Sequence, residues 1–274
     1  MLKASAIITT FRRITEKPGN RMNPESSIEL MLPPNTLTEA VDTFRAAAKA
    51  IIAAYNASDV QMADQTPPQE LVDGIEKFIG VATRLEQRQG GHERLSRDDI
   101  TRLGDYALTL LSDLGEWAMD LGQNMAQQQL EHFIMATAKW IVSENAELST
   151  LEPVVNAIAT VANSLRGPKE LGLLAQYMND VIGAIPDALK LDKETGDPTW
   201  SWRILLLNRS IVATRSHNTA LMEQVFDELV HHLPEEASRF FSEGMQQMDA
   251  LNYPPQVREI MQRYFDRFTR HRMH

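Results

Sequence analysis

Apolar residues recur at intervals of three and four from Thr36 almost to the end of this 274-residue chain. An α-helix turns once every 3.6 residues, so this spacing collects apolar side chains on one face of each helix. The longest stripe runs from Ile100 to Leu121. Comparable stripes span residues 37–55, 71–85, 130–140, 151–165, 171–185, 222–233, 237–248 and 257–268. The pattern predicts an all-α protein.

Helix-start signals divide the periodic region in the same way. Prolines stand at expected first helical positions, where the missing N–H costs little: Pro34, Pro68, Pro153, Pro168, Pro234 and Pro255. Ser96 precedes two aspartates, which is typical of an N-cap with acids in the first turn. We expect about ten antiparallel helices joined by mostly short loops, stacked as an irregular α-solenoid or as a compact helical array.

Composition along the chain predicts three regions. Residues 1–35 contain several prolines and are expected to form a flexible or irregular N-terminal segment. Within it, residues 1–21 are either an upstream extension or misassigned start, or a basic targeting or docking arm. Residues 36–190 form a helical domain with an acidic middle. After a charged loop ending at Thr199, residues 200–274 form a C-terminal helical subdomain that continues the stack. Its Ile204–Leu207 run is a buried helix or a short central strand, and its helical neighbours favour the helix.

Charge and cysteine content limit the classes of function. The formal net charge is −10, and residues 98–150 alone hold nine acidic against two basic residues. Nucleic-acid binding is therefore disfavoured, since phosphates demand a basic surface. Because the chain has no cysteine, thiolate metal sites and cysteine nucleophiles are excluded, and a reducing cytoplasm is the expected location. No apolar run approaches the roughly 20 residues that span a bilayer.

Motifs for catalysis and metal binding are weak. Glu228 and His231 have the Glu-x-x-His spacing of a di-iron ligand pair, but no second copy accompanies them. Neither the glycine-rich phosphate loops nor the Gly-x-Ser-x-Gly nucleophile motif occurs. We therefore expect no metal and no cofactor, and the catalytic residues, if the chain is an enzyme, are not identified by any motif.

A polar cluster between two apolar helices is the candidate ligand site. Residues 214–219 read Thr-Arg-Ser-His-Asn-Thr, which suits the end of one helix and the cap of the next. Functional sites favour such junctions. Arg203, Arg209, Arg215 and His217 are the residues from which we expect an anion-binding pocket.

The C-terminal helix is the candidate partner-binding element. Arg258, Arg263 and Arg267 flank its apolar stripe, and Phe265 adjoins Tyr264. A single helix face rarely buries both members of such an aromatic pair, and the same holds for Phe240-Phe241, so one member of each is expected to contact another subunit or a partner. The arginines predict attraction to an acidic partner or to the acidic region of a second copy. The alternative is a terminal helix whose arginines only face water.

These patterns favour a non-enzymatic helical scaffold that binds a protein partner or associates with itself. The alternative is a small-molecule or anion-binding protein, or an all-α enzyme, with its pocket near Arg203, Arg209, Arg215 and His217. The scaffold interpretation depends on the expected stack of helices and on the lack of a catalytic motif. Fold by itself does not determine function.

Overall fold

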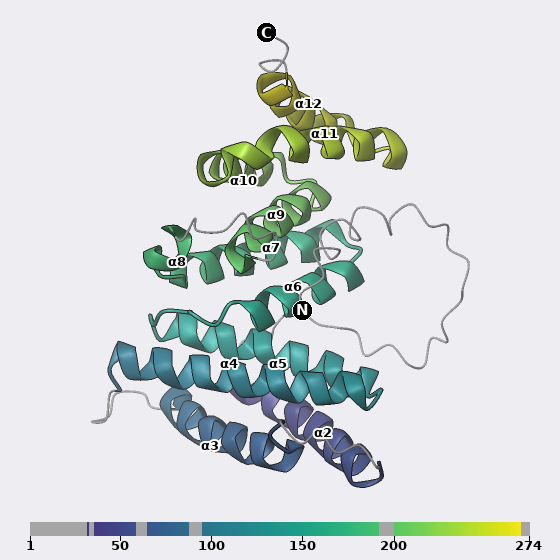
Figure 1. Ribbon diagram of the computed structural model, residues 1–274. Coiled ribbons are helices and arrows are strands. Elements are labelled where there is room, and N and C mark those ends of the chain that lie inside the picture. Colours follow the sequence, from purple (N-terminus) through teal and green to yellow (C-terminus); the bar gives the residue numbers. More distant parts are fainter. Residues whose placement is uncertain (1–31, 33–35, 59–64, 88–94, 192–199, 270–274) are drawn as a thin grey trace. The chain divides into compact units, whose positions relative to one another are not determined.

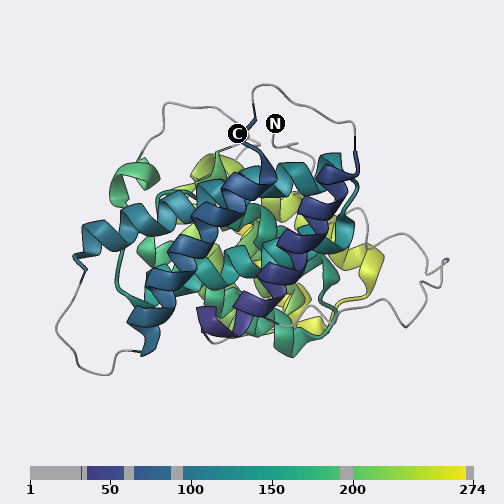
Figure 2. The same ribbon diagram turned by 90° about the horizontal axis from the view of Figure 1, so that it is seen from below.

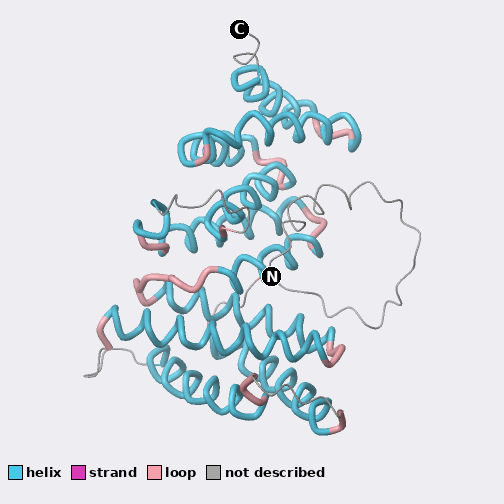
Figure 3. The backbone as a smooth tube through the Cα atoms, in the orientation of Figure 1, coloured by secondary structure: helices cyan, strands magenta, loops and turns pink. Residues whose placement is uncertain are grey.

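The computed structural model describes residues 32, 36–58, 65–87, 95–191 and 200–269. These residues form eleven helices and no strand. In Figure 3 the described part of the chain is drawn as helices joined by loops, with no segment in the strand colour. The prediction of an all-α chain with about ten helices is confirmed. Ile204–Leu207 lies within a helix, so the strand alternative is wrong. The predicted segment 1–35 lies almost wholly outside the described residues, and the solenoid-like stack stays a prediction.

The helices follow one another through mostly short turns (Figure 1). Their bounds are α2 Leu37–Asn56, α3 Pro68–Gln87, α4 Arg97–Asp120, α5 Asn124–Ser143, α6 Glu152–Ser164, α7 Pro168–Ala184, α8 Asp187–Leu191, α9 Ser201–Arg215, α10 Thr219–His232, α11 Pro234–Leu251 and α12 Pro255–Thr269. Four of the predicted proline starts are first helical residues: Pro68, Pro168, Pro234 and Pro255. The Ser96 hydroxyl caps α4 by accepting from the Asp99 N–H at 3.1 Å, as predicted.

The described chain divides into two compact units. The N-terminal unit contains α2 to α5, most of α6, the end of α7 and α8. The C-terminal unit contains the described residues of 162–178 and 193–274, and thus the end of α6, the start of α7, and α9 to α12. The sequence-based division between residues 190 and 200 stays a prediction.

In the N-terminal unit, α5 packs against α2 and α4, and α3 packs against both α2 and α4. Figures 1 and 2 both place α2 and α3 on one side of the α4–α5 pair. Large rings fill the interfaces, with Phe44 4.8 Å from Phe133 and Phe78 5.3 Å from Trp140, centroid to centroid. These burials supply the main stabilisation of the unit, since each large side chain withdrawn from water contributes about 1.5–3 kcal/mol.

In the C-terminal unit, α10 packs against α9, α11 and α12. Phe226 of α10 is fully buried and contacts both Phe240 and Phe241, with ring centroids 5.8 and 5.1 Å away. Both members of this adjacent pair are thus buried within one chain, against the expectation that one of them contacts another subunit or a partner. The reason is that α10 and α12 both pack against α11, which widens the face that α11 buries.

A buried carboxyl lies in the N-terminal unit, on α5. Glu131 Oε1 accepts a hydrogen bond from the Thr160 hydroxyl at 3.2 Å, and its Oε2 has no hydrogen-bond partner among the described residues. Burial raises the pKa of Glu131 from 4.5 to about 7, against the lowering effect of the Thr160 hydrogen bond. The charged form is therefore the one that folding disfavours.

Glu131→Gln should remove a pH-dependent loss of stability. Below pH 4.5 the Glu131 carboxyl is protonated in both the folded and unfolded states, so it carries no penalty. As the pH rises to about 7, only the unfolded chain releases the proton freely, and the wild type loses about 3 kcal/mol relative to the uncharged variant. Urea unfolding of both proteins between pH 4 and 8 measures this. If the free energies of unfolding of the two proteins change with pH in parallel, the predicted penalty at Glu131 is absent.

A cationic cavity as the candidate functional site

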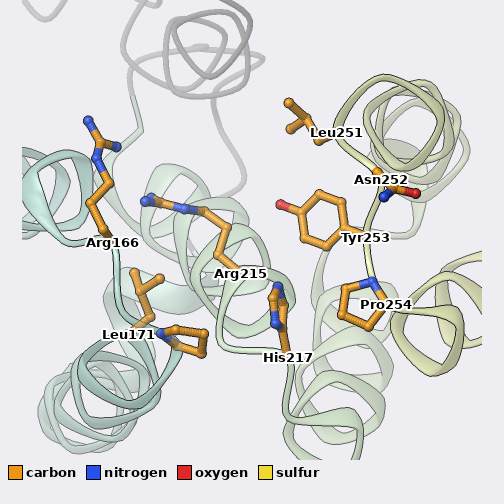
Figure 4. Close-up of a pocket in the computed structure, with 9 residues that line it drawn as sticks. Arg166, Leu171, Arg215, His217, Leu251, Asn252, Tyr253 and Pro254 are labelled. Carbon is orange, nitrogen blue, oxygen red and sulfur yellow. The ribbon is translucent and has the colours of Figure 1, made fainter. Parts of the chain in front are cut away.

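Three inter-helix turns of the C-terminal unit surround a cavity of about 280 Å³ (Figure 4). The turns join α6 to α7, α9 to α10 and α11 to α12. The lining consists of two arginines, polar and aromatic side chains, and four apolar residues: Arg166, Pro168, Leu171, Arg215, His217, Leu251, Asn252, Tyr253 and Pro254. Its volume is just below the usual range for pockets that bind drug-sized ligands, about 300–1,000 Å³, so it suits a small molecule.

Left-handed backbone conformations place two of the lining side chains. His217, just after α9, has φ of 58°, and Asn252, just after α11, has φ of 51°. This conformation ends a helix, and glycine adopts it most easily. Asparagine and histidine tolerate it better than most residues. Asn145 ends α5 in the same way, so the conformation alone does not mark a site. At these two turns it brings an imidazole and an amide to the cavity.

Arg215 is held in place by the end of α6. Its Nη1 donates to the Ala162 carbonyl and its Nη2 to the Leu165 carbonyl, each at 2.8 Å. The last carbonyls of a helix have no intrahelical donors and carry partial negative charge, so a cation suits them. These bonds fix the plane of the guanidinium and use two of its five N–H groups.

The electrostatic surroundings of Arg215 are unbalanced. Burial lowers the pKa of Arg215, nearby Tyr253 raises it and the positive charge of Arg166 lowers it, and no carboxylate of the described residues contributes. Arginine nevertheless stays protonated in proteins. None of the nine lining residues is acidic. Two positive charges therefore face a cavity whose nine lining residues include no acidic side chain.

Tyr253 and His217 form the aromatic part of the wall. Their rings meet edge to face with centroids 5.6 Å apart, which links the α9–α10 turn to the α11–α12 turn. Burial raises the pKa of Tyr253, and the neighbouring Arg215 lowers it less than burial raises it. The hydroxyl is therefore protonated at neutral pH and can donate a hydrogen bond. In Figure 4 this hydroxyl points toward the guanidinium of Arg215.

The structure brings together two of the four residues predicted for the anion pocket. Arg215 and His217 line the cavity, whereas Arg203 and Arg209 do not. Arg203 Nε donates to Glu236 of α11 at 2.7 Å, and the fully buried Arg209 pairs with Glu228 of α10. Both of these cations therefore have carboxylate partners already.

Sequence reasoning missed Arg166, Asn252 and Tyr253. They lie in two other turns, 37 or more positions from Arg215 along the chain. The turn signals themselves are visible in the sequence, as Arg166-Gly167-Pro168 and Tyr253-Pro254. Nothing in a single sequence shows that these turns meet the one after α9.

Glu228 of the Glu-x-x-His pair contacts other side chains of the C-terminal unit. Glu228 accepts from Arg209 and from Gln224, so it is already engaged. The described residues contain no group of three or more His, Asp or Glu side chains suited to a metal ion. No described helix is long and apolar enough to cross a bilayer.

The arginines of α12 also contact the rest of the C-terminal unit. Arg258 pairs with Asp249 of α11, and Arg263 Nη1 donates to Glu223 of α10 at 2.6 Å. Arg267 is exposed and lies over the ring of Phe268, with the guanidinium carbon 5.1 Å from the centroid, while Phe265 is half-buried. Two of the predicted partner-binding cations are thus neutralised by acids of their own chain.

Comparison of the chain with protein-family models, with curated proteins and with solved structures finds no match. The functional reading of the cavity therefore depends on its own chemistry. That chemistry is a fixed guanidinium, a second arginine beside it, a protonated tyrosine and an apolar wall.

Arg215 and Arg166 should contribute very differently to stability. Arg215→Ala removes two charge-assisted hydrogen bonds to the end of α6, and we expect a loss of about 2–4 kcal/mol in the free energy of unfolding. Arg166 is exposed, so Arg166→Ala should change it by less than about 0.5 kcal/mol. Urea unfolding at pH 7 measures both. Equal effects would contradict the anchoring role of Arg215.

Partner binding by α12 stays a prediction that charge reversal tests. If α12 binds the acidic region of a second copy, Arg263→Glu combined with Arg267→Glu should lower the mass seen by light scattering at low salt. Arg239→Glu is a matched control on α11, since Arg239 is exposed and pairs with Glu243 of the same helix. An unchanged mass at low and moderate salt would leave α12 as a terminal helix only.

Proposed function

We propose that the C-terminal unit binds a small anionic ligand in the cavity around Arg215. The observation that carries the proposal is the pairing of the three arginines of α9. Arg203 and Arg209 each meet a carboxylate, while the described contacts of Arg215 are two backbone carbonyls. A cation withdrawn from water without a counter-ion is costly, and an anion beside it offsets that cost.

Arg166 strengthens the attraction for an anion. It is exposed and close enough to Arg215 to lower the pKa of that residue, so the two positive charges act on the same region. Like charges held near each other repel, and a bound anion between them relieves the repulsion. None of the nine lining residues is acidic, so the lining itself supplies no counter-ion for these cations.

The proposal is one of binding rather than catalysis. The polar lining groups beside the arginines are an imidazole, an amide and a phenol. These groups donate and accept hydrogen bonds and thereby orient a ligand. No pair of lining groups has the nucleophile–base hydrogen bond that activates a covalent step.

Isothermal titration calorimetry with acetate, phenylacetate, sulfate, phosphate and phenyl phosphate tests the proposal. At least one of these anions should bind saturably at one site per chain. Arg166→Gln should weaken that binding about tenfold, equivalent to about 1.4 kcal/mol, because it removes one of the two cations. Arg102→Gln is the control, since Arg102 is an exposed arginine of α4 in the N-terminal unit.

The control variant should bind like the wild type. If no anion binds saturably, or if Arg166→Gln binds as tightly as the wild type, the proposed function is wrong. Raising the ionic strength should also weaken binding, since the exposed cation is screened by salt.

A further inference from the structure

Resting on the proposed anion site, we propose that its preferred ligand is a carboxylate borne by a small apolar or aromatic group, and not a phosphate. Two features of the cavity distinguish the two anions: the prolines at two adjoining helix starts and the geometry of the remaining arginine donors. The apolar part of the wall favours an apolar group on the ligand.

At two of the helix starts beside the cavity, prolines remove backbone N–H groups of the kind that commonly bind phosphate. Phosphate sites commonly use the free N–H groups of a helix N-terminus. Here α7 begins at Pro168, and α12 begins at Pro255 directly after Pro254. Proline has no N–H. Pro168 and Pro254 both line the cavity, so each replaces a possible donor with an apolar ring.

The start of α7 is also occupied by a carboxylate of its own. The Glu170 side chain folds back toward Gly167, so closely that a Cβ added to Gly167 would lie 1.7 Å from Glu170 Oε2. An acidic side chain in the first turn already compensates the helix dipole. This carboxylate repels any anion at the same helix end, and it repels a doubly charged phosphate more strongly than a singly charged carboxylate.

The remaining donors suit a planar monoanion. Arg215 keeps three N–H groups after its two bonds to the end of α6, all in the fixed plane of one guanidinium. A flat guanidinium matches a flat carboxylate through two parallel hydrogen bonds. Arg166 and the protonated hydroxyl of Tyr253 are further donors on the same cavity.

The rest of the wall favours an apolar group attached to the carboxylate. Pro168, Leu171, Leu251 and Pro254 are four of the nine lining residues, and the rings of Tyr253 and His217 adjoin them. Burying apolar ligand surface against such a wall is favourable in proportion to the area covered. The volume of about 280 Å³ limits that group to a short aliphatic chain or a single ring.

A matched set of probes tests the inference by calorimetry on the full chain. Phenylacetate and hexanoate have both a carboxylate and an apolar group. Acetate lacks the apolar group and phenylacetamide lacks the negative charge. Phenyl phosphate keeps the ring but has a phosphate in place of the carboxylate. We expect phenylacetate and hexanoate to bind at least tenfold more tightly than acetate, phenylacetamide and phenyl phosphate.

Two variants separate the parts of the site. Leu251 is a half-buried residue at the end of α11, and Leu251→Ala should weaken phenylacetate about fivefold while leaving acetate unchanged. Arg166→Gln should weaken the binding of phenylacetate and of acetate by the same factor. An equal effect of Leu251→Ala on both probes would contradict the apolar contact.

Each remaining outcome overturns a defined claim. If phenyl phosphate binds as tightly as phenylacetate or more tightly, the carboxylate preference is wrong and the anion site stands. If acetate matches phenylacetate, the apolar group plays no part and this inference is wrong. If phenylacetamide matches phenylacetate, or if no probe binds, the proposed function fails as well.

Discussion

Helix α9 is almost wholly buried, and each of its three arginines needs a hydrogen-bond acceptor. The acceptors lie on three other helices, so these bonds connect the helices of the C-terminal unit. Almost every residue of α9 from Trp202 to Thr214 is buried, including the guanidinium of Arg209. Removing such a charge from water costs several kcal/mol unless it is paired and hydrogen-bonded. Arg203 therefore meets α11, Arg209 meets α10, and Arg215 meets the end of α6.

The third of these interactions differs in kind, and the candidate function follows from that difference. Carbonyl dipoles satisfy the hydrogen bonds of Arg215 without neutralising its charge. The neighbouring turns add Arg166 rather than an acid. The same contact therefore fixes the guanidinium for stability and leaves it attractive to an anion. Arg215 thus has both a structural role and a proposed binding role. Substitutions of the exposed Arg166 are therefore used to test ligand binding without a change in stability.

Much of the fold could be predicted from the sequence because helix periodicity, proline starts and serine caps are local signals. Pro68, Pro168, Pro234 and Pro255 begin helices where their patterns indicated. Ile204–Leu207 is helical because its neighbours continue the helix, although it lacks a polar face.

The site was predicted only in part, because pairing between distant residues is not a local signal. The sequence does not distinguish the three arginines of α9. In the structure Glu236 pairs with Arg203 and Glu228 pairs with Arg209, which leaves Arg215 without a carboxylate among its described contacts. Tyr253 and Arg166 reach the cavity through turns remote in sequence. Phe240 and Phe241 are both buried for a similar reason, since α10 and α12 cover α11 together.

Nuclear magnetic resonance of the arginine Nε–Hε groups tests most directly whether Arg215 and Arg166 form an anion site. Single Arg→Lys variants assign the signals, and phenylacetate is then titrated into the labelled wild-type protein. The account predicts saturable shifts of the Arg215 and Arg166 signals, with those of Arg203 and Arg209 unchanged because Glu236 and Glu228 already hold them. Shifts confined to other arginines, such as Arg258 or Arg263, or no shift at saturating ligand, would contradict it.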